Sequence, residues 1–143
     1  MLKQGFLLAV VVLCTACVSQ ANHTDKIEQW LDKPAHVQAQ AIASGDTTSA
    51  ELVSGYLARI ERLDEKVNSV LALNPNALTE AKAIDKRLAN GETLGPLAGI
   101  PVLLKDNIES KEMPTTAGSM ALIANDTGRD APIVEKLKAA GAI

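Results

Sequence analysis

The residue best suited to chemistry in this sequence is Lys105, which directly follows the apolar run Ile100–Leu104. A free lysine has a pKa of about 10.4, so almost no lysine is neutral at pH 7. To act as a base near neutrality, a lysine needs that pKa lowered by about three units, and desolvation can supply a shift of this size. A buried strand that ends at Lys105 would place its amine at the edge of a cleft. The alternative is a solvated lysine at a strand end.

Other nucleophilic or metal-binding side chains are less well placed. Ser119 follows a glycine, but no G-x-S-x-G elbow surrounds it. Both cysteines lie within the first 20 residues, so no disulfide or thiolate metal site can form among the residues after Cys17. His23 and His36 are also early, and His36 is expected to be an ordinary surface group. The sequence therefore favours neither a zinc site nor a Ser-His-Asp triad, and we expect no metal and no cofactor.

The composition is that of an ordinary globular protein with an aliphatic core. The chain is 47% apolar and 22% charged, and its aromatic side chains are Phe6, Trp30 and Tyr56. A formal net charge of −3, without Lys/Arg clusters, gives no electrostatic footprint for nucleic acid, which we therefore exclude as a partner. The length of 143 residues suffices for one domain.

The first half of the chain predicts two helices. The stretch Trp30–Ser44 has apolar residues at helical spacing and is followed by a Gly-Asp pair that breaks it. A second helix is predicted from the capping-box pattern of Thr48 and Glu51, in which each side chain bonds the other residue's backbone N–H. Its apolar stripe consists of Leu52, Val53, Tyr56, Leu57, Ile60 and Leu63.

Two further helices follow. One runs from Ala77 to Leu88 and is closed by Gly91. The last helix is predicted to have Asp130 as its N-cap, Pro132 in its first turn and Gly141 at its end.

Three short segments predict strands. Val67–Leu73 alternates apolar and polar residues, Ile100–Leu104 is an apolar run with a proline at its start, and Ala142–Ile143 looks like the beginning of a further strand. Helices that alternate with short strands favour an α/β layered architecture. Since the sequence stops within a helix-to-strand passage, we expect an incomplete domain.

The segments Gly95–Ile108 and Met113–Ser119, with the helix and strand patterns on both sides, closely resemble the amidase signature family. The resemblance extends from about His36 to Ile143. It implies an α/β fold, a mixed β-sheet covered by helices, of which residues 22–143 would be the N-terminal part. It also implies hydrolysis of amide bonds through an acyl-enzyme, with a Ser–cis-Ser–Lys triad.

In this family the catalytic lysine lies in the motif that Lys105 matches. Both serines lie in a Gly/Ser-rich segment that would begin only after the end of this chain, so no residue here is assigned to them. By the same resemblance a substrate-pocket or packing loop would be formed by Thr115, Thr116, Ala117, Gly118 and Ser119. Asp106 is expected to bond backbone groups in the turn that follows it. The expected substrate is a small-molecule carboxylic amide.

Residues 1–21 resemble a signal peptide, with Lys3 before the apolar run Phe6–Leu13. That run is too short to span a bilayer as a helix. A buried N-terminal segment is the alternative, but the lone lysine before the run and the two cysteines at its end favour export.

Two cleavage sites compete at the end of this segment. Thr15-Ala16-Cys17 resembles a bacterial lipobox, although Cys14 stands where that pattern usually has Leu. In this case the signal ends at residue 16, and a lipidated Cys17 would attach the protein to a membrane. The other site is Ser19-Gln20-Ala21, cut before Asn22. Both predict an exported protein, either periplasmic or a membrane-anchored lipoprotein.

Two other functions stay open. The chain could be a truncated amidase-like protein without activity, and we expect the 143 residues by themselves to be inactive. It could also be the A subunit of a tRNA-dependent amidotransferase, which works in the cytoplasm with partner subunits, and the predicted export argues against this. The sequence does not define the oligomeric state.

Overall fold

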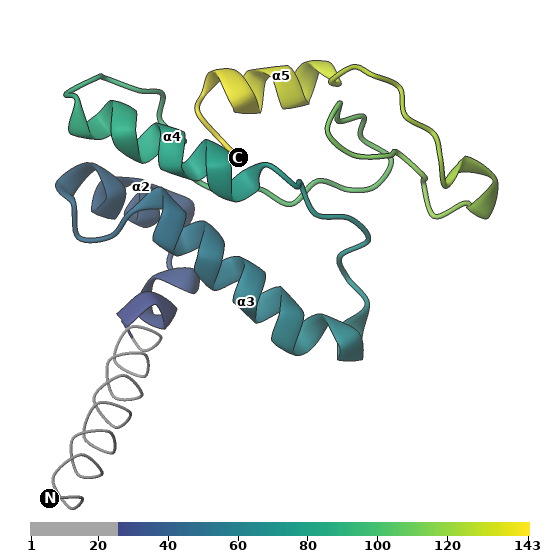
Figure 1. Cartoon of the computed structure of the whole chain (residues 1–143), viewed down its shortest axis with the longest axis horizontal. Coiled ribbons are helices and arrows are strands. Elements are labelled where there is room, and N and C mark those ends of the chain that lie inside the picture. Colours follow the sequence, from purple (N-terminus) through teal and green to yellow (C-terminus); the bar gives the residue numbers. More distant parts are fainter. Residues whose placement is uncertain (1–25) are drawn as a thin grey trace, which may run out of the picture.

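Helices joined by long loops make up residues 26–143, the part of the chain that the computed structural model describes (Figure 1). Residues 26–31 are helical, and the elements that follow are α2 (Ala35–Ser44), α3 (Ser49–Val67), α4 (Ala77–Ala89), the 3₁₀ helix η1 (Met120–Leu122) and α5 (Pro132–Ala139). Residues 1–21, the predicted signal peptide with its candidate lipidation residue Cys17, lie outside the described residues. None of the helices in residues 26–143 is long and apolar enough to cross a membrane.

The helical stretch predicted within Trp30–Ser44 is confirmed as α2, and Pro34 separates it from the helical residues before it. These earlier helical residues end at residue 31, and α2 begins directly after the proline. Proline has no N–H to donate, and it disfavours helical backbone at the residue before it. Gly45 then ends α2 in the left-handed conformation, with φ of 80°, as the sequence predicted.

The capping box at the start of α3 is confirmed. The Glu51 N–H donates to Thr48 Oγ1 over 3.1 Å, and the Thr48 N–H donates to Glu51 Oε2 over 3.0 Å. A second acceptor comes from α4, since the Asp85 carboxylate accepts from the N–H groups of Ser49 and Ala50 at 2.7 and 2.9 Å. This carboxylate lies at the positive end of the α3 dipole and joins the two helices, which lie side by side (Figure 1).

The prediction of a strand at Val67–Leu73 is wrong. Val67 is the last residue of α3, and the residues after it form no strand. The Asp64 carboxylate accepts from the N–H groups of Ser69 and Val70 at 2.8 and 3.2 Å. These two donors are therefore satisfied by the helix end and are not available to a sheet neighbour.

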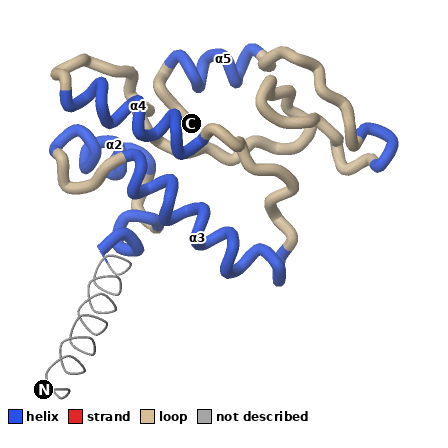
Figure 2. Tube along the Cα trace, viewed as in Figure 1, coloured by secondary structure: helices blue, strands red, loops and turns tan. Residues whose placement is uncertain are grey.

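The segment Ile100–Leu104 forms no strand either, and over residues 26–143 only an isolated bridge between Ser110 and Met113 is assigned (Figure 2). One rung of pairing is present. The Ile143 N–H donates to the Ile100 carbonyl over 2.9 Å, and the Val102 N–H donates to the Ile143 carbonyl over 2.8 Å. One residue that donates to and accepts from two residues of the neighbouring segment, as Ile143 does here, is the pattern of parallel strands. Residues 26–143 thus show one rung of strand pairing. The mixed sheet predicted from the sequence stays a prediction.

The buried core gathers around α3. Leu31, Ile42, Leu52 and Ile100 form its central cluster. At Gly99 the backbone lies close to the Ser49 side chain, whose hydroxyl donates to the Gly99 carbonyl over 2.8 Å. This contact and the burial of the next residue, Ile100, fix the N-terminal end of the segment that leads to Lys105.

The loop before Ile100 is held on the C-terminal end of α5 by backbone hydrogen bonds. The Leu97 N–H donates to the Ala140 carbonyl, and the Gly99 N–H donates to the Gly141 carbonyl, both over 2.9 Å. A Cβ added at Gly95 would lie 2.3 Å from the Ala140 carbonyl oxygen, so this contact requires glycine.

The start of α5 differs from the prediction in one residue. Pro132 occupies the first turn as expected, but the N-cap is Ala131 and not Asp130. The Asp130 carboxylate is used elsewhere: it accepts from the Lys111 N–H over 2.9 Å and from Lys138 Nζ over 2.7 Å. A tertiary ion pair has replaced the predicted local cap.

Candidate functional site

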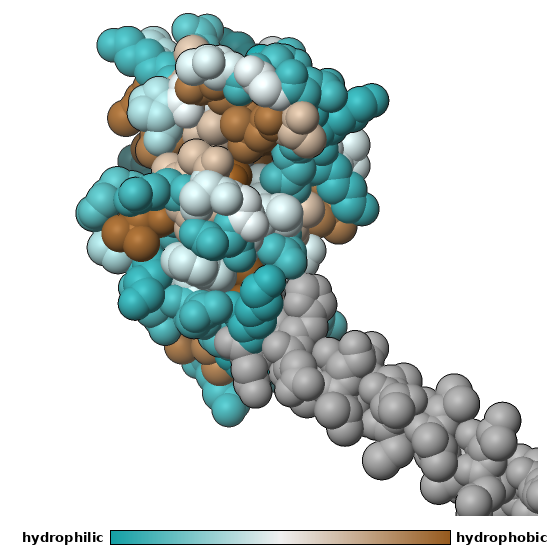
Figure 3. Space-filling model, turned by 90° about the vertical axis from the view of Figure 1, so that its left-hand side faces the viewer, coloured by the Kyte–Doolittle hydropathy of each residue, from teal (hydrophilic) through white to brown (hydrophobic). Residues whose placement is uncertain are grey.

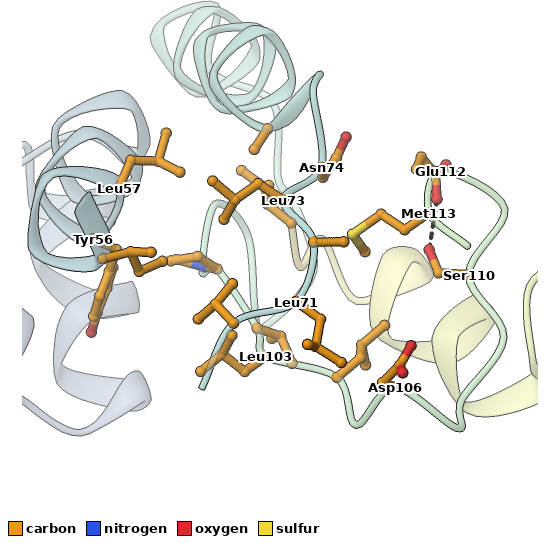
Figure 4. A pocket seen from close by; sticks show the side chains of 18 of the residues that line it. Tyr56, Leu57, Leu71, Leu73, Asn74, Leu103, Asp106, Ser110, Glu112 and Met113 are labelled. Atoms are coloured by element: carbon orange, nitrogen blue, oxygen red, sulfur yellow. Dashed lines mark hydrogen bonds between the residues drawn. The ribbon is translucent and has the colours of Figure 1, made fainter. Parts of the chain in front are cut away.

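A cavity of about 800 Å³ lies between α3, the segment after it, α5 and residues 101–114. Its walls are mainly apolar, and Leu57, Leu71 and Leu103 contribute to them (Figure 4). The cavity is an open groove, because Leu71 and Leu103 remain 69% and 77% exposed. Figure 3 shows apolar side chains exposed on one face of the molecule. An apolar lining with a few polar groups is the usual composition of a small-molecule site.

Lys105 is among the residues that line this groove. The segment that carries Lys105 differs from the prediction. Leu103 and Lys105 are exposed, and the segment before Lys105 is extended but is not a buried strand. The described residues therefore do not supply the desolvation that a base at this position needs. Its assignment as the base stays a prediction.

Asp106, the next residue, is bound firmly to a loop ten residues further along the chain. Its Oδ1 accepts from the Thr116 N–H over 3.0 Å, and its Oδ2 accepts from the Gly118 N–H over 3.1 Å and from the Thr116 hydroxyl. Its backbone carbonyl accepts from the Ala117 N–H over 3.0 Å. The Thr116 hydroxyl, with these N–H groups, holds the pKa of Asp106 below its ordinary value. The carboxylate bonds backbone groups as expected, but in a different loop.

The predicted pocket residues Thr115 to Ser119 form that loop. Thr115 is buried, and its N–H donates to the Asn125 carbonyl over 3.0 Å. None of the five residues lines the groove, whose lining on this side reaches Pro114. The loop thus lies beside the residue that follows Lys105 but outside the cavity, and its role in substrate binding stays a prediction.

A polar cluster at the groove was not predicted from the sequence. Lys138 Nζ donates to Glu112 Oε2 over 2.6 Å and to Asp130 Oδ2 over 2.7 Å. The Ser110 hydroxyl donates to Glu112 over 3.0 Å (Figure 4). Ser110, Glu112 and Lys138 all line the groove. No local pattern could have revealed the cluster, since Glu112 and Lys138 are 26 residues apart.

The ion pairs decide the charge state of this cluster. Burial by itself would lower the pKa of Lys138, but its hydrogen bonds to Asp130 and Glu112 outweigh burial, and the pKa is raised. Burial would likewise raise the pKa of Glu112, but the hydrogen bonds from Lys138 and Ser110 outweigh it, and the pKa is lowered. The Lys138 hydrogen bond also lowers the pKa of Asp130. All three groups are thus held in their charged forms, which suits a structural role.

Among residues 26–143, no three His, Cys, Asp or Glu side chains lie together in a group that could hold a metal ion.

Comparison with known proteins gives a consistent result. The family model described as Amidase matches residues 51–143. The chain is 42% identical to the A subunit of the glutamyl-tRNA(Gln) amidotransferase of Streptomyces coelicolor over 106 residues, which are 73% of this chain and 21% of that protein.

Two solved structures are similar over most of the chain. The peptide amidase of Stenotrophomonas maltophilia matches with a TM-score of 0.76 and 38% identity, over 80% of this chain and 24% of that one. An amidase family protein of Bacillus anthracis matches with a TM-score of 0.76 and 35% identity, over 86% and 25%. The chain therefore spans 21% to 25% of the length of these three proteins.

Proposed function

Since this chain belongs to the amidase signature family, we propose that its gene product hydrolyses a carboxylic amide, with Lys105 as the general base. One observation carries the proposal. The matched residues 51–143 include Lys105, which lies at the rim of an apolar groove directly after the apolar segment that the sequence singled out.

The proposed chemistry is acyl transfer to a serine. Neutral Lys105 accepts a proton, relayed through the cis serine, as the nucleophilic serine attacks the amide carbon. The tetrahedral intermediate collapses when the C–N bond breaks and the amine leaves with a proton, so that an acyl-enzyme remains. Water then attacks the ester and releases the acid. In this proposal both serines and the oxyanion hole are contributed by sequence outside these 143 residues, which would also cover Lys105 and desolvate it.

The groove suggests where an apolar part of the substrate would lie. Its walls offer aliphatic side chains on both sides, and Asn74, Ser110 and Glu112 are polar groups on its lining. We propose that the acyl or amine substituent of the amide lies along these walls. Because the lining is mainly apolar, a small amide with an apolar substituent is the first substrate to test.

A trapping experiment tests the proposed function. The purified gene product is incubated with a simple aliphatic amide and hydroxylamine, and both the released amine and the hydroxamate are measured. An acyl-enzyme predicts hydroxamate in competition with acid, because hydroxylamine attacks the same ester as water. Amine release without any hydroxamate would contradict the covalent mechanism, and no turnover with a broad set of amides would contradict the activity.

The second candidate function is that of the glutamyl-tRNA(Gln) amidotransferase relatives. It is favoured by the 42% identity to the Streptomyces protein. The apolar segment Phe6–Leu13 predicts export and favours the free amidase instead. Cell fractionation separates the two: a cytoplasmic protein that copurifies with further subunits supports the amidotransferase, and an exported protein that acts alone supports the amidase.

A further inference from the structure

Three consecutive backbone N–H groups converge on one residue next to the proposed base. The N–H groups of Thr116, Ala117 and Gly118 all donate to Asp106, two to its carboxylate and the middle one to its backbone carbonyl. The Thr116 hydroxyl adds a further bond to the carboxylate. The loop thus wraps around Asp106, and the arrangement resembles the concave anion sites that successive N–H groups form.

The backbone of the loop is adapted to this arrangement. Ala117 and Gly118 both have left-handed backbone, with φ of 49° and 73°. For alanine this conformation is unfavourable, because its Cβ comes too close to the following carbonyl oxygen. Hydrogen bonds to a charged acceptor are stronger than those between neutral groups and offset that cost.

The segment that carries Lys105 is therefore fixed at both ends. On its N-terminal side Ile100 is buried in the core, and Val102 is bonded to Ile143. On its C-terminal side the Ile108 N–H donates to the Lys105 carbonyl over 2.9 Å, and Asp106 is held by the loop. The Lys105 side chain itself is exposed, so its Cα position depends on these backbone contacts.

We propose that Asp106 is a positioning residue. It holds Lys105, the proposed base, at a fixed place relative to the loop of residues 116–118. The catalytic consequence rests on the proposed function, but the mechanical one does not. A displacement of about 1 Å in a catalytic group can cost about a hundredfold in rate. Loss of the Asp106 carboxylate should therefore lower kcat and leave KM unchanged.

The mechanical part is tested on the gene product by ¹⁵N relaxation. In the wild type we expect backbone order parameters of about 0.85 at Lys105 and Thr116, falling toward about 0.6 in Asp106→Ala. Asp106→Asn keeps one acceptor oxygen and should give intermediate values, and it replaces the alanine variant if that one does not fold. The matched control is Asp126→Ala, which removes a carboxylate that accepts from the Gly128 N–H in a nearby turn. An unchanged order parameter at Lys105 in both Asp106 variants would overturn the inference.

The catalytic part is tested with the active gene product by a double-mutant cycle. Asp106→Asn should lower kcat about tenfold or more at constant KM, and the same change in a Lys105→Ala background should have no further effect, because Asp106 acts only through Lys105. Equal losses in both backgrounds would mean a purely structural role and would overturn the inference. If Lys105→Ala retains full activity, the proposed function fails, and the relaxation experiment still decides whether Asp106 fixes the segment.

Discussion

At the scale of single residues, Lys105 and Asp106 differ in their surroundings within residues 26–143. The carboxylate of Asp106 accepts three hydrogen bonds from one loop. Lys105 is exposed at the rim of the groove. The hydrogen-bond partners of the Asp106 carboxylate therefore all lie within residues 26–143, whereas the proposed base still needs an environment that removes water from its amine.

The role of Lys105 predicts a specific mutational pattern in the active gene product. Lys105→Ala should lower kcat by at least about a hundredfold, as expected for the loss of a positioned base. Lys105→Arg should be nearly as poor, since a guanidinium stays protonated at any working pH. Steady-state kinetics measures both effects. Lys111→Ala, at an exposed lysine nearby, is the control and should be active. Near-wild-type kcat/KM in Lys105→Ala would show that the base is another residue.

The cluster of Lys138, Glu112 and Asp130 predicts how stability depends on pH. The carboxylate pKa values are lowered from ordinary values of 4.5 and 3.8, so their stabilisation is present above about pH 5 and is lost as the pH falls through the lower folded values. The Lys138 pKa is raised from 10.5, so its stabilisation is present below that pH and is lost as the pH rises through the folded value.

Lys138→Met should flatten both limbs of that profile. Since the Lys138 side chain is 39% exposed, solvent screens the pairs, and we expect a loss of about 1 kcal/mol or less at pH 7. Urea unfolding between pH 3 and pH 11 measures it. Lys136→Met, at an exposed lysine of the same helix, is the control, and an equal effect in both variants would count against the ion pairs.

At the scale of elements, the N-terminus of α3 is the best-supported helix end in the described chain. It combines its own capping box with the carboxylate of Asp85 from α4. Ser49 is fully buried and bonds the carbonyl of Gly99. One helix end thus connects α3, α4 and the segment that leads to Lys105.

The capping box predicts a measurable contribution to stability. Thr48→Ala should lower the free energy of unfolding by about 1 kcal/mol, since the Glu51 N–H loses its acceptor. Ser54→Ala, at an exposed position within the same helix, should stay within about 0.5 kcal/mol of the wild type. Urea unfolding at constant pH compares the two. Equal stability of Thr48→Ala and the wild type would mean that water replaces the cap without loss.

The close approach at Gly99 gives a matched pair of glycine substitutions. Gly91 and Gly99 have almost the same left-handed φ, +79° and +78°, but an added Cβ meets nothing within 4 Å at Gly91, whereas at Gly99 it lies 2.6 Å from the Cβ and Oγ of Ser49. Gly91→Ala should cost about 1–2 kcal/mol from the backbone alone. Gly99→Ala should cost about 1–3 kcal/mol more from the overlap. Equal losses in urea unfolding would show that Ser49 can move aside.

At the scale of the whole molecule, the described chain leaves an apolar groove open to solvent. Large apolar side chains on its walls are exposed, among them Leu71, Leu73 and Leu103. Exposed apolar surface of this kind usually marks a binding or packing site. Because the chain spans about a fifth of its Streptomyces relative, we propose that further parts of the amidase fold close this groove in the active enzyme.

Export is the prediction that concerns the whole protein in its cell. The segment Phe6–Leu13 should direct the chain out of the cytoplasm and be removed. Mass spectrometry of the protein from its native host should find a new N-terminus at an acylated Cys17 or at Asn22. Replacing Leu8 by Arg should abolish export, while Gln4→Ala should not. A cytoplasmic protein that retains Met1 would contradict this prediction and favour the amidotransferase.

The sequence by itself determined the features whose partners are close along the chain. The capping box of Thr48 and Glu51, the end of α2 at Gly45 and the place of Pro132 in α5 each depend on residues within one helical turn. The family could be identified in the same way, because the segments Gly95–Ile108 and Met113–Ser119 are each contiguous and can be compared without a folded structure.

Tertiary structure alone decided the contacts between residues far apart in the sequence. Glu112 pairs with Lys138, 26 residues away, and Asp130, predicted as a helix cap, accepts from the Lys111 N–H, 19 residues away. The strand predicted at Val67–Leu73 does not form, and Ile100–Leu104 shows one rung of pairing, for the same physical reason: a helix satisfies its hydrogen bonds locally, but a strand needs a neighbour. Val67 therefore stays in α3, and Ile100–Leu104 pairs only where Ile143 reaches it.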